Sequence, residues 1–185
     1  MENFEALEVI SRYRNDAIVV MTMTAHREWP RITTNPDLDL PMSGCMGKAS
    51  SVGLGLALAK PEKKVIVFDG DGSLLMNLGS LVTIANMAPP NLIHFVCYNS
   101  IYRITGGQPI PGVGIFSFKG IASAAGYANA YEFQDLKSLE DNIETIMNQA
   151  GPTFVCIQVA PNKKHPGKGI KTVDIIPRFK LALKG

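Results

Sequence analysis

A carboxylate held between two glycines follows a short apolar run in this sequence. Residues 64–69 (KVIVFD) are typical of a buried strand, and Gly70, Asp71, Gly72 and Ser73 come directly after it. The glycines allow a sharp turn and close approach to a ligand, and Ser73 begins a helix-like segment whose free N–H groups attract phosphate. Asp71 would repel a bare phosphate, so a divalent cation between the two is the best chemical interpretation. The pattern predicts a magnesium-phosphate site.

Further oxygen ligands follow the next predicted strand, residues 91–98. Asn99 comes directly after it, and the backbone carbonyl of Ile101 is available two residues later. Ligands of open α/β sheets collect at the carboxyl ends of strands, so these groups are expected near Asp71. Two alternatives exist, because Asp-Gly is a strong hairpin signal and a single Asn often caps a loop. The length and leucine content of the segment after Ser73 favour a helix over a hairpin.

The elements that must position these residues alternate along the chain. Apolar periodicity predicts helices at 3–14, 48–60, 74–87, 118–125, 138–149 and 174–183, and strands at 17–23, 64–69, 91–98, 130–133 and 153–159. Residues 24–47 are rich in Pro, Gly, Asn and Asp and are predicted to form a loop. Pro177 is expected in the first turn of the last helix. The alternation predicts an α/β fold: a three-layer, doubly wound, mostly parallel sheet with helices on both faces.

Composition narrows the class of protein. The 185 residues suit one domain, and 46% apolar with 18% charged residues is typical of a folded protein. A net charge of +2 and the lack of a basic stripe argue against nucleic acid as a partner. No run of about 18 apolar residues predicts a membrane span, and the acidic N-terminal segment is unlike a signal peptide, so the cytoplasm is the expected location.

Two smaller features carry less information. Cys45, Cys97 and Cys156 are odd in number and far apart, which predicts neither a disulfide framework nor an iron–sulfur site. The basic stretch from Pro161 to Lys171 is typical of a solvated loop, with an anion-facing lid as the alternative.

The order of the two motifs resembles the signature of thiamine-diphosphate enzymes, in which GDG is followed after about 25 residues by a pair of asparagines. Here 25 residues separate GDG from Tyr98-Asn99, so the first Asn of the pair is a tyrosine. The resemblance implies that Asp71, Asn99 and the Ile101 carbonyl hold Mg²⁺ on the diphosphate. It also implies that Gly70, Gly72, Ser73 and Tyr102 contact the cofactor.

Two further stretches are similar to parts of that family. "SGCMG" resembles its G-x-M-G segment, which implies that Gly44, Cys45 and Met46 meet the aminopyrimidine and that the Met side chain bends the cofactor. "TAHREW" resembles the diphosphate-contacting loop of acetohydroxyacid synthases, which implies that Thr24, Ala25 and His26 lie near phosphate. Taken alone, Met46 is typical of a core residue and His26 of a structural histidine.

The resemblance covers one of the two cofactor-binding domains of such enzymes. Residues 1–185 match the diphosphate-binding domain, and the pyrimidine-binding domain, which supplies a catalytic glutamate, is not matched. Glu28 is interpreted as structural or interfacial. The resemblance is strongest to the sulfopyruvate and phosphonopyruvate decarboxylases, carried by "GDGSLLMNLGSLVTIAN" and "TGGQP". It implies a β subunit in a hetero-oligomer whose α subunit provides the pyrimidine domain.

The implied reaction is the nonoxidative decarboxylation of a small 2-oxo acid. Arg27, Arg103, Thr105 and Gln108 are candidates to contact this substrate. A surface or interface ion pair is the alternative for each arginine and is the favoured interpretation of Arg27, while turn-forming roles suit Thr105 and Gln108 equally well. Two other functions remain open: a carboligase subunit of the acetolactate-synthase type, and a noncatalytic scaffold that binds magnesium and phosphate. A ferredoxin-dependent oxidoreductase subunit is less favoured because the cysteines are not clustered.

Overall fold

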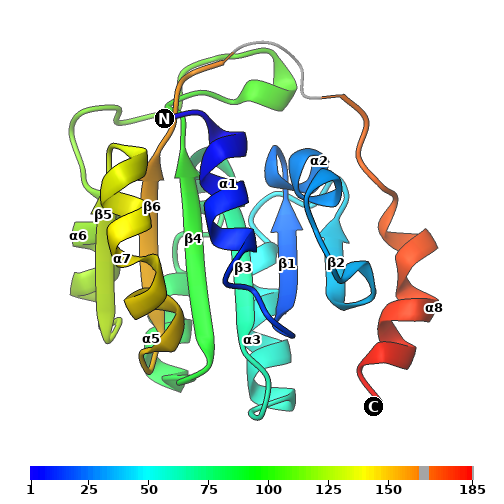
Figure 1. Ribbon diagram of the computed structural model, residues 1–185. Helices are drawn as coiled ribbons and strands as arrows, with labels where there is room; N and C mark the ends of the chain where they lie inside the picture. The colour runs from blue at the N-terminus through cyan, green and yellow to red at the C-terminus, as the bar shows by residue number, and fades with distance from the viewer. Residues whose placement is uncertain (163–166, 185) are drawn as a thin grey trace.

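Six parallel strands form the centre of the protein, in a computed structural model that describes residues 1–162 and 167–184. Their order is β2-β1-β3-β4-β6-β5, and every neighbouring pair is parallel (Figure 1). The strands are β1 Ile18–Thr22, β2 Asp39–Met42, β3 Val65–Gly70, β4 Leu92–Tyr98, β5 Asn129–Phe133 and β6 Thr153–Gln158. The order reverses between β1 and β3, which are adjacent although β2 and α3 separate them in the chain. Such a reversal point is where α/β sheets bind ligands.

Helices cover both faces of this sheet. They are α1 Asn3–Ser11, α2 Ala25–Glu28, α3 Ala49–Ala59, α4 Asp71–Leu75, α5 Ser80–Met87, α6 Phe118–Ala125, α7 Leu136–Asn148 and α8 Thr172–Ala182. One core lies beneath α1, α2 and α7, and a second lies beneath α3, α5, α6 and α8. Successive residues of β1 alternate between them: Val19 and Met21 belong to the first, Ile18 and Val20 to the second. The predicted doubly wound α/β fold is confirmed.

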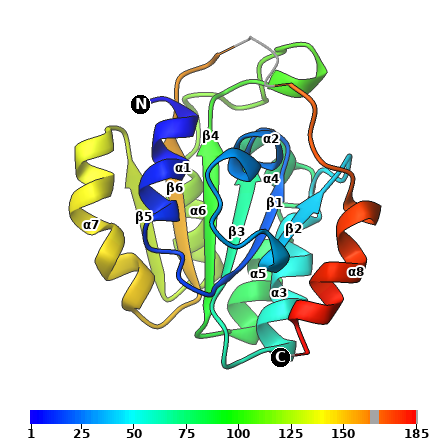
Figure 2. The ribbon, with the colours of Figure 1, turned by 45° about the vertical axis from the view of Figure 1, so that its right-hand side comes forward.

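The structure corrects the prediction for residues 24–47, which do not form a continuous loop. They contain α2, two 3-10 turns and the edge strand β2, whose sequence is DLPM. Proline is typical of loops, and Pro41 therefore favoured a loop in the prediction. It is tolerated in an edge strand, where one side of the backbone lacks a strand partner. Helix α8 then covers the strand (Figure 2).

Two helix predictions also need correction. The segment predicted as one helix at 74–87 contains α4 and α5, with turns at residues 76–79, and α4 begins at Asp71 itself. Helix α8 begins at Thr172, two residues before the predicted start, so Pro177 lies inside the helix and not in its first turn. A proline there removes one backbone hydrogen bond from the helix.

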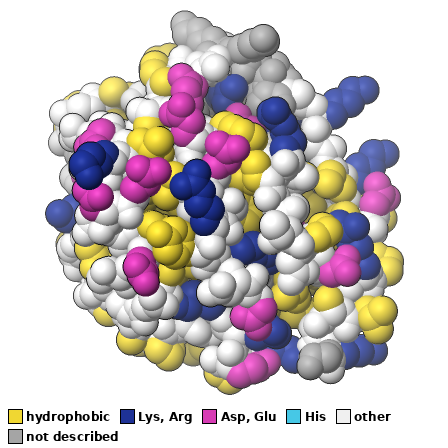
Figure 3. Space-filling model, in the orientation of Figure 1, with side chains coloured by type: hydrophobic (Ala, Val, Ile, Leu, Met, Phe, Trp, Pro, Cys, Tyr) yellow, Lys and Arg dark blue, Asp and Glu magenta, His cyan; other side chains and the backbone are white. Residues whose placement is uncertain are grey.

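In the described residues, no helix has both the length and the apolar character needed to cross a bilayer. Figure 3 shows acidic and basic side chains interspersed on the face that carries α1 and α7.

A buried ion pair fixes the edge of the sheet. The Arg14 guanidinium lies 3.0 Å from the Asp39 carboxylate of β2, and both side chains are almost fully buried. Arg14 also donates to the Thr33 hydroxyl at 2.8 Å and to the Ala17 carbonyl at 2.5 Å. Burial raises the pKa of Asp39, against the opposing effect of the Arg14 charge. These contacts join the turn after α1 to β2.

Replacement of Asp39 by alanine should therefore destabilise the fold strongly, because it leaves a buried, uncompensated guanidinium. We expect the free energy of unfolding in urea to fall by about 3–5 kcal/mol. Asp16→Ala is the matched control: Asp16 pairs with Lys63 at 2.8 Å, but its side chain is 74% exposed. This control should cost about 1 kcal/mol or less. Equal losses in the two variants would contradict the assigned role of the buried pair.

Candidate functional site

A pocket lies at the carboxyl ends of β1, β3 and β4, at the reversal point of the sheet. Figure 2 shows α2 and α4 at this end of the strands. The walls of the pocket come from the end of β1 with the start of α2, from the β3–α4 turn, from Met46, and from the loop after β4. The lining residues are Thr22, Met23, Thr24, Ala25, Met46, Asp69, Gly70, Asp71, Gly72, Ser73, Cys97, Asn99, Ile101, Tyr102, Arg103, Ile104 and Thr105.

The Asp71 carboxylate joins two walls of this pocket. One oxygen, Oδ1, accepts the backbone N–H of Gly72 at 2.7 Å. The other, Oδ2, accepts the N–H groups of Asn99 at 3.0 Å and Ser100 at 2.7 Å. The side chain is 2% exposed, and burial raises the pKa of Asp71 to about 6 although these three N–H groups favour the carboxylate. The ends of β3 and β4 are thus connected through one carboxylate.

Asn99 and Ile101 line the same pocket as this carboxylate and carry two more oxygens, an amide and a carbonyl. The Asn99 amide oxygen accepts the N–H of Ile101 at 3.0 Å, and the Ile101 carbonyl accepts the N–H of Arg103 at 3.0 Å. Each oxygen keeps a further lone pair, because an amide or carbonyl oxygen has two. No group of three or more His, Cys, Asp or Glu in the described residues is arranged to hold a metal. A metal here would take carboxylate, amide and carbonyl oxygens, a donor set that fits Mg²⁺.

Two glycines allow loops to pack tightly around the site. A Cβ on Gly72 would lie 2.4 Å from the Tyr102 ring, so only glycine lets this ring cover the β3–α4 turn. Gly47 has φ +71° and donates its N–H to the Ser73 hydroxyl at 2.9 Å, while Asn77 donates to the Gly47 carbonyl at 2.9 Å. These bonds hold the loop that carries Met46 against α4.

The structure brings most of the predicted site residues to this pocket. The predicted residues that line it are Thr24, Ala25, Met46, Gly70, Asp71, Gly72, Ser73, Asn99, Ile101, Tyr102, Arg103 and Thr105. The predicted residues that are not part of its lining are His26, Arg27, Gly44, Cys45 and Gln108. Their cofactor and substrate contacts therefore stay predictions.

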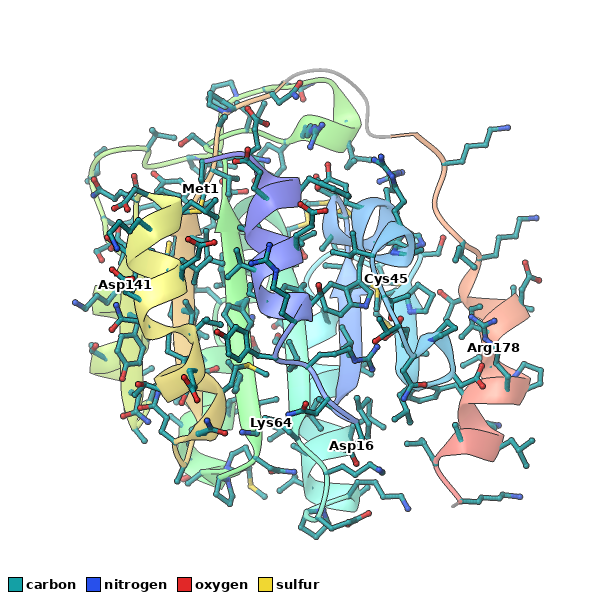
Figure 4. All side chains as sticks on the ribbon, viewed as in Figure 1. Met1, Asp16, Cys45, Lys64, Asp141 and Arg178 are labelled. Atoms are coloured by element: carbon teal, nitrogen blue, oxygen red, sulfur yellow. The ribbon has the colours of Figure 1, made fainter. Side chains whose placement is uncertain are left out.

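Each of these five residues has an identifiable environment. His26 Nε2 lies 2.6 Å from the Ile170 carbonyl, so the ring joins α2 to the segment before α8. Burial lowers the pKa of His26. Exposed Cys45, labelled in Figure 4, follows Gly44 after β2 and donates its thiol to the Ser43 carbonyl. Gln108 accepts the N–H of Tyr102 through its backbone carbonyl at 2.8 Å. Arg27 donates to the Met23 carbonyl at 3.2 Å.

The basic stretch is only partly described. Residues 163–166 lie outside the described residues, so the choice between a solvated loop and a lid stays open for them. Glu28 is buried, accepts the Asn3 amide at 2.5 Å and pairs with Arg103 at 3.2 Å. These contacts agree with the interpretation of Glu28 as a structural residue.

Sequence reasoning missed a buried polar group behind the site. Asp69 lines the pocket; its Oδ1 accepts the N–H of Gly70 at 3.0 Å, while Oδ2 is buried without a hydrogen bond. That oxygen lies 3.8 Å from His94 Nε2, and His94 Nδ1 lies 3.3 Å from the Tyr127 hydroxyl. Both Asp69 and His94 stand within apolar strands, and no local spacing signals that they meet. Pairing of β3 with β4 brings them together.

Comparison with known proteins decides the family. Residues 18–157 match the family described as thiamine pyrophosphate enzyme, C-terminal TPP binding domain. The chain belongs to this family. It is 37% identical over 187 residues to the sulfopyruvate decarboxylase subunit beta of Methanothermobacter thermautotrophicus, covering 100% of this chain and 97% of that protein.

Two other proteins that the chain resembles are longer. The chain is 38% identical over 148 residues to phosphonopyruvate decarboxylase of Streptomyces viridochromogenes, covering 80% of this chain and 36% of that protein. Benzoylformate decarboxylase of Polynucleobacter necessarius shares the fold with a TM-score of 0.71 at 19% identity, over 88% of this chain and 34% of that one. The chain thus spans nearly all of the first relative and about a third of the other two.

The raised pKa of Asp71 predicts a pH-dependent stability of the metal-free chain. The pKa of Asp71 is about 6 in the folded state, against an ordinary value of 3.8 for an aspartate carboxyl, so folding favours the protonated acid. The resulting stability is fully present below pH 4 and is lost as the pH rises through 6, by up to about 3 kcal/mol at 1.4 kcal/mol per pKa unit.

Urea unfolding of the wild type and of Asp71→Ala at pH 4.5 and pH 7.5 measures this effect. The wild type should lose more stability than the variant between these two pH values. An equal pH dependence in both proteins would refute the assignment to Asp71.

Proposed function

We propose that this chain is the β subunit of a 2-oxo acid decarboxylase that depends on thiamine diphosphate and Mg²⁺. The proposed substrate is sulfopyruvate, phosphonopyruvate or a similar acid, in keeping with what the names of its relatives state. One observation carries the proposal: the Asp71 carboxylate accepts the N–H of Asn99, which supports a metal site shared by the two residues. Residues 1–185 act as one diphosphate-binding domain in this proposal.

The residues of the pocket have distinct tasks in this proposal. Asp71, Asn99 and the Ile101 carbonyl hold Mg²⁺, whose charge neutralises the diphosphate and allows it to lie beside a carboxylate. Thr24, Ala25 and the turn of Gly70, Gly72 and Ser73 contact the phosphate oxygens. Gly44, Cys45 and Met46 face the remainder of the cofactor, and His26 holds the phosphate loop in place.

The cofactor supplies the difficult chemistry. When bound, thiamine diphosphate takes up the electron pair that is released as carbon dioxide leaves the 2-oxo acid. The protein's part is to orient this group and to exclude water. Tyr102 and Ile104, which line the pocket beside the metal ligands, form the apolar wall suited to that task.

The proposal requires a partner. The glutamate that protonates the aminopyrimidine is assigned to an α subunit, so that the active enzyme is a hetero-oligomer. Glu28, the acid of α2, supports this assignment because its carboxylate is already held by Asn3 and Arg103. The beta-subunit name of the full-length relative supports it too. The cytoplasmic location stays a prediction from the sequence.

Loss of Asp71 should abolish Mg²⁺-dependent cofactor binding in the assembled complex, because Asp71 supplies the carboxylate among the three proposed ligands. Calorimetric titration of thiamine diphosphate, in the presence of Mg²⁺, into the complex should show no binding to Asp71→Ala. It should also show none to Asp71→Asn, a variant that retains the side-chain volume. Asp141→Ala, at an exposed position on α7, is the control and should bind normally. A melting curve verifies that each variant is folded. Undiminished cofactor affinity in either Asp71 variant would reject the metal site.

The second prediction of this proposal concerns the isolated chain. Purified alone and supplied with thiamine diphosphate and Mg²⁺, it should release no carbon dioxide from sulfopyruvate, phosphonopyruvate or pyruvate, because it lacks the acid that activates the cofactor. Addition of the α subunit should restore release, with an aldehyde as the product. Decarboxylation by the chain alone would overturn the split-enzyme proposal, acetolactate as product would indicate the carboligase, and no turnover with a partner would indicate the scaffold.

A further inference from the structure

Two arginines lie beside the pocket, and one of them pairs with a buried carboxylate. Arg103 lines the pocket, pairs with Glu28 at 3.2 Å and has a side chain only 9% exposed. Arg27 belongs to α2, directly after two lining residues, and its guanidinium donates to the carbonyl of Met23, another lining residue. Figures 1 and 2 show the loop after β4 extending over the same end of the sheet as α2.

The charges of Arg27, Arg103 and Glu28, the described residues of this cluster that carry charge, do not cancel. Arg27 and Arg103 contribute two positive charges and Glu28 one negative charge, and Asn3, which also donates to Glu28, is neutral. Arg27 makes no ion pair with any described residue, and its Nε is buried without a hydrogen-bond partner. Burial, and secondly the charge of Arg103, lower the pKa of Arg27, yet an arginine remains protonated near neutral pH. A buried donor without a partner destabilises the folded state unless a ligand accepts its hydrogen bond.

We propose that Arg27 and Arg103 bind the second anionic group of a dianionic 2-oxo acid, the sulfonate or phosphonate that remains on the product. This inference rests on the proposed function and specifies the substrate class for the same pocket.

The chemistry of decarboxylation explains why a cationic cluster belongs at that end of the substrate. The carboxylate that leaves as carbon dioxide loses its charge during the reaction, so a strong cationic contact there would stabilise the ground state and slow the step. The second anionic group keeps its charge throughout the reaction, so a cationic contact there binds the substrate without slowing the decarboxylation. Guanidinium groups suit it because their donors form a fixed fork that matches the oxygens of such anions.

The first test compares substrates in the complete complex with the α subunit. Arg27→Met keeps most of the side-chain volume and removes the charge, and Arg27→Lys keeps the charge without the fork. The ratio of kcat/KM for sulfopyruvate to that for pyruvate should fall about ten- to a hundredfold in Arg27→Met and less in Arg27→Lys. Arg12→Met is the control, because Arg12 is 67% exposed and lies just after α1, away from the pocket.

The second test needs no turnover. Calorimetry measures the affinity of the cofactor-loaded complex for 3-sulfopropanoate, an unreactive dianion, and for propanoate, its monoanionic counterpart. The wild type should prefer the dianion, and Arg27→Met should lose most of this preference.

The outcomes separate the two proposals. Binding of 3-sulfopropanoate through Arg27 in a complex that decarboxylates none of the acids would reject the proposed function and leave the anion site standing. Decarboxylation with an unchanged substrate ratio in Arg27→Met, or a wild type that does not prefer the dianion, would overturn the anion site.

Discussion

The buried carboxylate of Asp71 is the constraint on which the site depends. A carboxylate that is 2% exposed must be satisfied by hydrogen bonds, and here the three donors are backbone N–H groups from two segments, the turn after β3 and the loop after β4. The loop that carries Asn99 and Ile101 is therefore held by the same side chain with which it is proposed to share a metal. The hydrogen bonds to Asp71 thus hold together the two segments that carry the proposed ligands.

The sheet supplies the rigidity that this arrangement needs. β3 pairs with β4 along its whole length, from Val65 opposite Leu92 to Gly70 opposite Cys97, so the two loops start from fixed points. Two of the four non-glycine residues with positive φ in the described residues lie at the rim: Met23 has φ +52° and Ser100 has φ +65°. Such conformations cost free energy and persist where the surrounding structure holds them. Met23 also accepts the Arg27 donor, so this strained position links the pocket to the cationic cluster.

Local patterns are sufficient to predict five of the six strands and the centre of the site, because apolar runs mark buried strands and parallel strands bring their carboxyl ends together. Asp71 and Asn99 were found in this way. Strand β2 cannot be predicted in this way, because its aspartate and proline are typical of loops. Asp39 is buried there because it pairs with Arg14, which is distant in the sequence. Nor could spacing reveal that Asp69 faces His94, or that His26 contacts Ile170, because these contacts depend on tertiary packing. The predicted start of α8 is wrong for a simpler reason: the residues at this start carry no strong capping signal.

The central claim is that one aspartate and one asparagine at the ends of neighbouring strands share a metal ion. Diffraction from crystals of the assembled complex with thiamine diphosphate and Mn²⁺ in place of Mg²⁺ tests it directly, because anomalous scattering locates the ion. We predict a peak about 2.0–2.3 Å from one Asp71 oxygen, the Asn99 amide oxygen and the Ile101 carbonyl, beside the diphosphate. A diphosphate bound in this pocket with its ion outside the reach of Asp71 and Asn99 would contradict the account.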